Sequence, residues 1–302
     1  MAGRLLRLEE LSSSEVADLD REKTAFFIPV SPIEGHGPHL PLGVDYYNAI
    51  YFAETIARIT LEKRPDFDVV LLPIFPLGTQ VYRQPGSIGI SGITLYRIIV
   101  SLGESIASSG FRHIFLLSGH GSPRHIVATE SACLKVSWKF KVKMHDLSGA
   151  LAFRFLTGEF VDRISAYLPQ PLTQSEKELL RKDIHGGWWE TSMMLLLRPD
   201  LVKDSFRSLP STQKGTGKDS RDPGYFGSPS LATAAFAQAS MRVMIEEGTG
   251  TVERCLSGEN VLSETISPFY RVLPLRPFFA RNAVVILLAI IVLVIAAIIY
   301  LI

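Results

Sequence analysis

The sequence contains little cysteine and no excess of either charge. Of its 302 residues only Cys133 and Cys255 are cysteines, and neither belongs to a CxxC pair. Such isolated cysteines argue against a structural disulfide or a thiolate zinc site and favour a reducing compartment. Lys and Arg number 31 against 30 Asp and Glu, which leaves a formal net charge of +1. We therefore expect no nucleic-acid partner, because that function calls for a concentrated basic surface.

The N-terminus lacks an apolar signal region, since charged residues recur between Arg4 and Glu10. The C-terminus is the opposite, because residues 283–302 contain no charge, glycine or proline. About 20 apolar residues in a helix span roughly 30 Å, the thickness of a bilayer core. Arg276 and Arg281 precede this run and no positive charge follows it. The sequence therefore predicts a single-pass C-terminal membrane anchor, with the preceding domain in the cytoplasm.

Four apolar runs have the length of buried strands and lie at residues 24–30, 68–75, 113–117 and 141–147. Stretches with apolar residues at helical spacing follow them, at residues 46–63, 94–109, 124–138, 193–197 and 231–247. Strands that alternate with helices predict a layered α/β fold with a mostly parallel sheet and helices on both faces. We expect residues 1–268 to form one domain, residues 269–282 a linker and residues 283–302 a transmembrane helix.

Three polar clusters each follow a predicted strand or open a predicted helix. They are SPIEGHGPHLPLGVD at residues 31–45, SGHGS at residues 118–122 and HGGWWETS at residues 185–192. Because open α/β sheets bind ligands at the carboxyl ends of their strands, one sheet edge can gather all three.

Four residues of these clusters, Glu34, His36, Asp45 and His120, supply mixed carboxylate and imidazole ligands. That ligand set suits Zn²⁺, Mn²⁺ or Fe²⁺, and a carboxylate can bridge two ions. Glu34 and His36 are two residues apart, so their side chains point the same way in an extended segment. One Glu-x-His is usually a surface pair, but its combination with the two later clusters argues against chance.

Five stretches resemble motifs of the creatininase family, in unbroken order between about residues 20 and 250. The most specific are EGHGPHLPLGVD at residues 34–45, similar to the signature loop, and HGGWWETS at residues 185–192, similar to the third motif. The others are at residues 85–88, 119–121 and 227–233.

The resemblance implies a layered creatininase-like α/β fold, often a homohexamer, that hydrolyses cyclic or linear small-molecule amides at a dinuclear metal centre. By motif position, Glu34, Asp45 and His120 would hold one divalent ion, and His36 and Asp45 the other. The ions would be Zn²⁺, Mn²⁺ or Fe²⁺, and a water bridging them would become the hydroxide nucleophile.

The third motif supplies the expected catalytic residues. His185, on a Gly-Gly turn, is a candidate to stabilise the tetrahedral intermediate or to protonate the leaving nitrogen. Glu190 is either a further metal ligand or a residue that orients one. Trp188 and Trp189 flank these residues and are candidates to line the substrate pocket, although packing at the head of a helix explains them equally well.

Two departures from the family pattern bear on the substrate. Gly35 stands where the family commonly has glutamine, and Ser122 stands where the creatinine-hydrolysing branch has a metal-binding glutamate. Serine is a poor ligand, so Glu190 is expected to complete the second metal site while Ser122 faces the substrate. Creatinine itself is then not the expected substrate.

Three functions therefore stay open. The first is a membrane-anchored metal-dependent amidohydrolase. The second is a membrane scaffold or sensor that binds metal with weakened catalysis, as Ser122 suggests. The third is a peptide-processing hydrolase of cofactor maturation, because some members of the family act on peptide-derived precursors.

Overall fold

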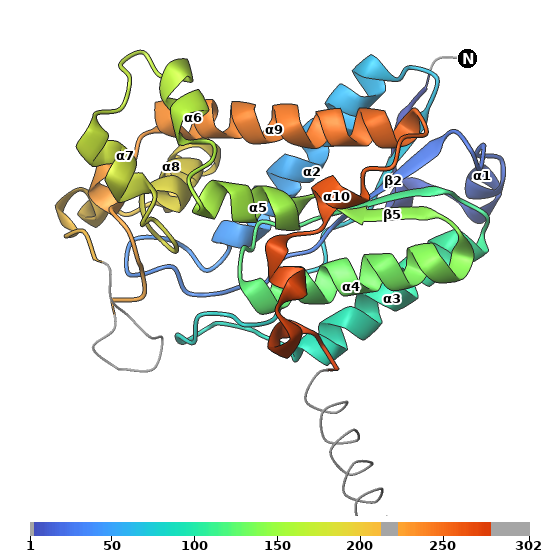
Figure 1. Ribbon diagram of the computed structural model, residues 1–302, viewed down its shortest axis with the longest axis horizontal. Helices are drawn as coiled ribbons and strands as arrows, with labels where there is room; N and C mark the ends of the chain where they lie inside the picture. The colour runs from blue at the N-terminus through green and yellow to red at the C-terminus, as the bar shows by residue number, and fades with distance from the viewer. Residues whose placement is uncertain (1–2, 213–222, 279–302) are drawn as a thin grey trace, which may run out of the picture.

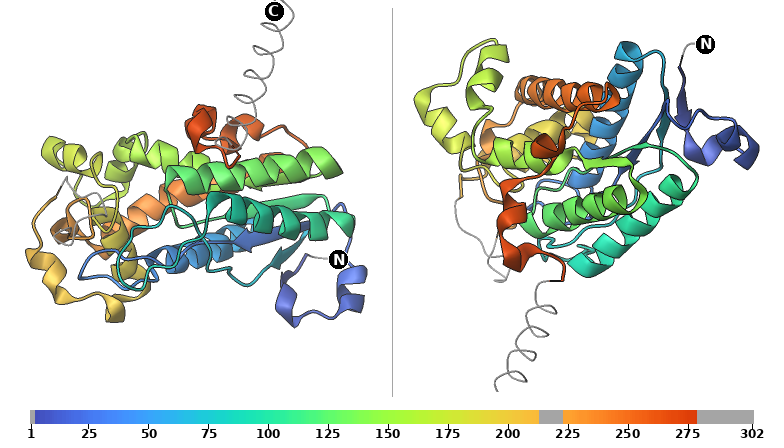
Figure 2. Two further views of the ribbon diagram at one scale, coloured as in Figure 1. Left: turned by 90° about the horizontal axis from the view of Figure 1, so that it is seen from below. Right: turned by 45° about the vertical axis from the view of Figure 1, so that its right-hand side comes forward.

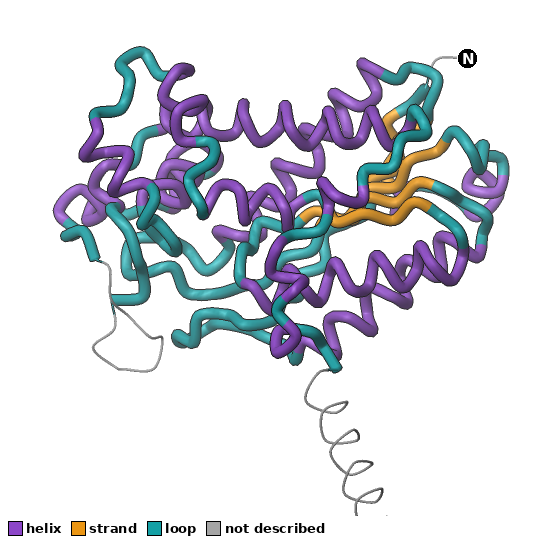
Figure 3. Tube along the Cα trace, viewed as in Figure 1, coloured by secondary structure: helices purple, strands orange, loops and turns teal. Residues whose placement is uncertain are grey.

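The computed structural model describes residues 3–212 and 223–278. In this part, parallel strands form a five-stranded sheet in the order β1-β3-β2-β4-β5 (Figure 3). The strands are β1 Leu5–Arg7, β2 Thr24–Pro29, β3 Asp68–Leu71, β4 His113–Leu117 and β5 Lys143–Asp146. The predicted layered α/β fold with a parallel sheet is confirmed.

Helices cover both faces of this sheet (Figures 1 and 2). The α-helices are α1 Ser13–Ala17, α2 Val44–Lys63, α3 Gly92–Ser108, α4 Pro123–Phe140, α5 Ser148–Leu156, α6 Val161–Tyr167, α7 Gln174–Leu180, α8 Trp188–Leu197, α9 Ala234–Leu256 and α10 Leu262–Thr265. Short 3-10 helices are η1 Leu8–Glu10, η2 Pro199–Leu201, η3 Asp204–Ser208, η4 Pro229–Leu231, η5 Pro268–Arg271 and η6 Leu273–Leu275.

The central strand β2 shows why the strands are continuous apolar runs in the sequence. Ala25 and Phe27 pack in the core with α2, α8 and α9, whereas Phe26 and Ile28 pack in the core with α3 and α4. Successive side chains of a strand point to opposite faces, so a sheet covered on both sides needs an apolar residue at every position.

The prediction for the helix at residues 231–247 was wrong at its C-terminal end. We expected a stop at Gly248, but α9 continues to Leu256. A Cβ at position 248 would lie 2.8 Å from Cδ1 of Ile56 in α2. Gly248 therefore permits close packing of two helices instead of ending one.

The edge strand β1 was missed because only three residues, Leu5 to Arg7, pair with β3. The predicted strand at residues 68–75 is also shorter than expected and ends at Leu71. The second half of that run forms an isolated bridge, from Phe75 to Val30, and then leads into the loop before α3.

The C-terminal segment from α10 to Phe278 crosses α4 and α5 (Figure 1). The backbone N–H of Ser267 donates to Oε1 of the buried Glu130 at 2.7 Å. The ring centroids of Phe153 in α5 and Phe269 lie 5.0 Å apart. The described part of the predicted linker thus packs on the domain.

The predicted transmembrane helix at residues 283–302 lies outside the described residues. Among the helices of residues 3–212 and 223–278, none is long and apolar enough to cross a membrane.

Candidate metal centre

The loop between β2 and α2 positions the first group of candidate ligands. The backbone N–H of Glu34 donates to Leu42 O at 3.0 Å, and that of Gly35 donates to Ser87 Oγ at 2.9 Å. These bonds hold the loop in a fixed path, with the side chains of Glu34 and His36 buried. Helix α2 begins at Val44, so its first turn brings Asp45 to the same place.

The loop after β4 brings His120 against the first loop. A Cβ at Gly119 would lie 2.9 Å from Cβ of Asn48 in α2 and would clash with the backbone oxygen of Asp45. Glycine is therefore required before His120, because the two segments approach so closely.

The third polar cluster, at residues 185–192, depends on Asp183, which the sequence reasoning missed. Its buried carboxylate accepts N–H bonds from Trp188 at 2.7 Å, Trp189 at 2.8 Å and Ser228 at 3.2 Å. It thereby caps the start of α8, whose first turn carries Glu190. Burial raises the pKa of Asp183 to about 7, although these donors oppose the shift.

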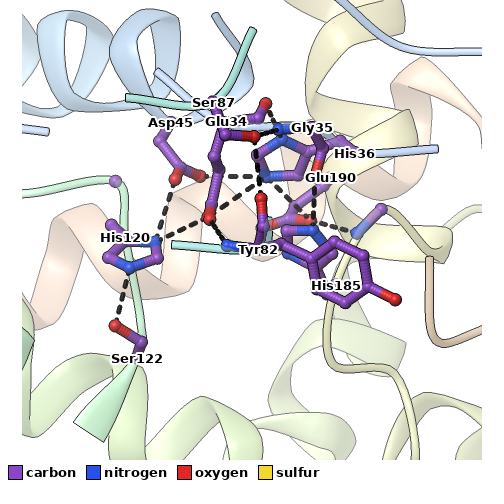
Figure 4. A network of polar contacts seen from close by, with 12 residues as sticks. Glu34, Gly35, His36, Asp45, Tyr82, Ser87, His120, Ser122, His185 and Glu190 are labelled. Atoms are coloured by element: carbon purple, nitrogen blue, oxygen red, sulfur yellow. Dashed lines mark hydrogen bonds and ion pairs between the residues drawn. The ribbon is translucent and has the colours of Figure 1, made fainter. Parts of the chain in front are cut away.

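Asp45 is shared by two groups of possible ligands (Figure 4). One group is Glu34, Asp45 and His120, and the other is His36, Asp45 and Glu190; the ligand atoms of each lie within 4.8 Å of one another. Nδ1 of His120 lies 2.9 Å from both Glu34 Oε1 and Asp45 Oδ2. Nε2 of His36 lies 3.2 Å from Asp45 Oδ1 and 3.6 Å from Glu190 Oε2.

A backbone carbonyl fixes one nitrogen of each histidine at this site. His36 Nδ1 lies 3.0 Å from Glu34 O, His120 Nε2 3.2 Å from Thr79 O, and His185 Nε2 2.8 Å from Gly35 O. Because a carbonyl oxygen can only accept, each of these nitrogens carries the hydrogen. The other nitrogen of His36 and of His120 is left to face the carboxylates.

Ser122 orients His120 and is not placed as a ligand. Its hydroxyl donates to Thr79 O at 3.1 Å, and its Oγ lies 2.6 Å from Nε2 of His120. The imidazole can thus donate to Ser122 while Nδ1 points to Glu34 and Asp45. Such outer partners of a metal-binding histidine fix its tautomer and ring orientation.

The donor set fits a divalent metal. Glu34 Oε1, His36 Nε2 and both carboxylate oxygens of Asp45 are buried and make no hydrogen bond of normal geometry. Carboxylates and imidazoles at this spacing are the usual ligands of Zn²⁺ and Mn²⁺. Divalent ions held by the two groups of possible ligands would satisfy these atoms.

The carboxylates and imidazoles of the site each favour the charged form of the other. Burial alone would lower the pKa of His36 and His120, but the surrounding carboxylates outweigh it and raise both well above the usual value. Burial would raise the pKa of Asp45, but the two imidazoles hold it well below its usual range. Asp45 is therefore ionised at neutral pH.

His185 stands beside this cluster. Its ring centroid lies 4.2 Å from that of His36 and 4.9 Å from that of Tyr82, on which it stacks. Burial and the nearby His36 lower the pKa of His185, so its imidazole is neutral at neutral pH. Tyr82, also missed from the sequence, donates its backbone N–H to the Glu34 carboxylate.

Only one of the two tryptophans faces the cavity in front of the cluster. This cavity has a volume of about 1140 Å³ and is lined by Glu34, His120, Ser122, His185, Trp189 and Glu190, among others. Trp188 is buried instead and stacks on Phe236 with 4.7 Å between ring centroids. His39, in the same loop as Glu34 and His36, is buried, and its Nε2 lies 2.8 Å from Thr191 Oγ1.

The family profile described as creatinine amidohydrolase matches residues 9–251. The chain belongs to the creatininase family. The mycofactocin precursor peptide peptidase of Mycobacterium tuberculosis is 26% identical over 260 residues, which cover 81% of this chain and 91% of that protein. The creatinine amidohydrolase of Pseudomonas putida is 25% identical over 184 residues, which cover 58% of this chain and 65% of that protein.

Solved creatininase structures share the fold. One with the description "Creatininase Mn" has a TM-score of 0.63 at 19% identity and covers 84% of this chain and 99% of its own. A mutant creatininase described as "Zn-Zn type" has a TM-score of 0.62 at 20% identity and covers 84% of this chain and 98% of its own.

Proposed function

We propose that this creatininase-family protein is a metal-dependent amidohydrolase with two divalent ions, which Asp45 bridges. The observation that carries the proposal is the shared position of Asp45 between two groups of buried ligands. Glu34 and His120 complete one group, and His36 and Glu190 complete the other. Glu190 thus supplies the carboxylate that Ser122 cannot.

Divalent ions held by these residues would supply a Lewis acid for an amide carbonyl and would lower the pKa of a bound water. The protein's own residues orient the reactants and move protons. His185 lines the cavity, and its Nε2 is fixed by Gly35 O, so Nδ1 is the atom available to exchange a proton with the substrate. Hydrolysis adds OH to the acyl carbon and H to the nitrogen as the C–N bond breaks.

Metal analysis and an amide panel test this proposal. We expect purified protein to contain about two divalent ions per chain and to hydrolyse some member of a panel of cyclic and linear amides. His185→Ala should keep the metal and lose roughly 10²–10⁴-fold in kcat. Protein that binds no metal would contradict the proposal, and metal without any turnover would favour the scaffold or sensor instead.

A second candidate is the processing of a peptide-derived precursor. Relatives named mycofactocin precursor peptide peptidase, aligned over most of their length, favour it. The cavity of about 1140 Å³ also has room for a peptide segment. Incubation with short peptides, followed by mass spectrometry, distinguishes it, because a peptide-processing enzyme releases a fragment where the small cyclic amides stay intact.

The apolar run at residues 283–302 supports a further part of the proposal, namely that a C-terminal anchor holds the catalytic domain at the cytoplasmic face of a membrane. A chain truncated after Pro277 should move from the membrane fraction to the supernatant. Family membership supports a homo-oligomer, and the mass of the truncated protein by light scattering tests it.

A further inference from the structure

The cavity in front of the candidate ligands is larger than a small cyclic amide needs. Its volume is about 1140 Å³, whereas pockets for drug-sized ligands measure roughly 300–1,000 Å³. The candidate ligands form only part of its wall. Two other groups of lining residues, one apolar and one basic, have no part in the hydrolysis proposed above.

The apolar group lies on α5 and around the start of α8. Leu151, Ala152 and Phe155 line the cavity, and their spacing places them on one face of α5. The ring centroid of Phe155 lies 5.2 Å from that of Trp189. Ile184 also lines the cavity and is 64% exposed. An apolar ligand part would remove these surfaces from water, which is favourable.

The basic group consists of three exposed arginines from different segments: Arg83 in the loop before α3, Arg124 in the first turn of α4, and Arg181 just after α7. Across residues 3–212 and 223–278, none of them forms an ion pair, whereas Arg154 and Arg163 share a glutamate partner elsewhere on the surface.

The cavity wall carries charges of both signs, but its acidic and basic residues differ in their partners. The acidic residues of the wall are Glu34, Asp183 and Glu190, and each already accepts hydrogen bonds from backbone N–H groups. Among the described residues the three arginines form no ion pair, so an anionic ligand group can approach them without breaking one. Guanidinium groups are also well shaped to bind carboxylates.

We propose that the natural substrate is an amide with an apolar body and an anionic group, such as a carboxylate. Its apolar body lies along α5 and Trp189, and its anion faces Arg83, Arg124 and Arg181. This inference rests on the proposed amide hydrolysis. A peptide with a free carboxyl terminus and an N-acyl amino acid share this chemistry. A small neutral ring would leave both groups of wall residues without a partner.

Binding of two ligands of matched shape tests the inference without turnover. Calorimetry on the full chain loaded with Zn²⁺ compares 4-phenylbutanoate with the neutral 4-phenylbutanamide. We expect the anion to bind about tenfold more tightly, and the triple variant Arg83→Gln, Arg124→Gln, Arg181→Gln to lose that preference. Arg97→Gln, an exposed arginine outside the cavity, is the matched control and should keep it.

Other results would overturn the inference. Equal binding of the two ligands would do so, and so would a preference that survives in the triple variant, because the carboxylate would then bind the metal instead. Ile184→Ser, at an exposed position that the core does not need, should weaken the binding of both ligands by a similar factor. Unchanged binding in this variant would exclude the apolar part of the proposed site.

Turnover separates this inference from the proposed function. N-acetylphenylalanine and a phenylalanine-containing dipeptide with a free carboxyl terminus represent the two sources, and their carboxamides are the neutral controls. If neutral and anionic amides are cleaved with equal kcat/KM, this inference fails and the proposed function stands. If the ligands bind as expected but no amide is cleaved, the proposed function fails and the anion site stands.

Discussion

Buried carboxylates in two regions of this protein face different partners. Asp45 faces two imidazoles, which hold its pKa well below the usual range. Glu130 and Asp146 instead accept from hydroxyl and N–H donors, including Ser267 N and Ser148 N, and the nearby Asp146 adds to the upward shift of the Glu130 pKa. There burial dominates and raises the pKa of Glu130 to about 8 and that of Asp146 to about 6.

The comparison shows what makes a buried acidic group suitable for a metal. Burial by itself favours the neutral carboxylic acid, which is a poor ligand. At the candidate metal centre, histidines at 2.9–3.2 Å keep the Asp45 carboxylate ionised. The residues that keep the acid charged are also the residues that would share the ion with it.

Replacement of Asp45 should give the largest effect, since it belongs to both ligand groups. Asp45→Asn keeps the size of the side chain but removes the charge between His36 and His120. We expect both ions to be lost and activity to fall by more than the roughly 10–100-fold that changing an outer partner of a ligand costs. Metal analysis after dialysis measures this. A variant that retains two ions would refute the bridging role.

Replacement of Ser122 should have a smaller effect, because it acts through His120. Ser122→Ala removes the hydroxyl at 2.6 Å from Nε2, and we expect metal affinity to fall about 10–100-fold. Ser122→Thr keeps the hydroxyl and is the control. Competition with a chromophoric chelator measures the affinity. Equal affinity in the Ala and Thr variants would show that the serine does not orient the ligand.

The pH dependence of metal binding tests whether the carboxylates of the candidate metal centre keep its histidines protonated. The carboxylates raise the pKa of His36 and His120, so these imidazoles hold protons that a metal must displace. We expect metal affinity to rise as pH increases from 6 to 8, by up to about tenfold per pH unit for each displaced proton. Chelator titrations at several pH values test this, and an affinity independent of pH would contradict it.

The smallest effect is expected for Glu130, one of the two buried carboxylates outside the candidate metal centre. The pKa of Glu130 is raised from 4.5 to about 8, so the folded protein binds this proton more tightly than the unfolded chain. Protonation of Glu130 therefore stabilises the folded protein fully below about pH 4.5, and this stabilisation is lost as pH rises toward 8. Glu130→Gln does not titrate, and its Tm should therefore fall less than that of the natural protein between pH 5 and 8.

The matched control for this last variant is the exposed Glu259→Gln, whose Tm should follow the pH dependence of the natural protein. Thermal unfolding followed by circular dichroism across the pH range gives both curves. Parallel curves for the natural protein and the Glu130 variant would mean that Glu130 is not protonated in the folded state.

The sequence predicted four of the five described strands and the three polar clusters because both depend on short segments. Buried strands such as β2 are visible as apolar runs, and Glu34, His36 and Asp45 lie in one loop and the helix turn after it. Asp183 was missed because its partners, including Ser228, are defined only after folding. The one feature of the sequence that could have indicated Asp183 is its position two residues before His185, in the stretch Asp-Ile-His-Gly-Gly at residues 183–187.

Other residues could not be identified from the sequence because their roles depend on contacts between distant segments. Tyr82 stacks on His185 and donates its N–H to Glu34, from a loop that carries no ligand itself. Ser122 looked like a lost ligand, and its bond to the far side of His120 is visible only in three dimensions. A motif identifies ligands more readily than the residues that hold them.

The glycine at position 35 has a consequence for how this family can vary. A Cβ at Gly35 would lie 2.7 Å from Cβ of Gln84, whose side chain fills the space beside it. Gly35→Gln alone, toward the residue common in the family, should therefore disrupt the loop that carries Glu34 and His36, while the double change with Gln84→Gly should be tolerated. We therefore expect the two positions to be epistatic, so that the order in which they mutate decides which sequences an evolving lineage can reach.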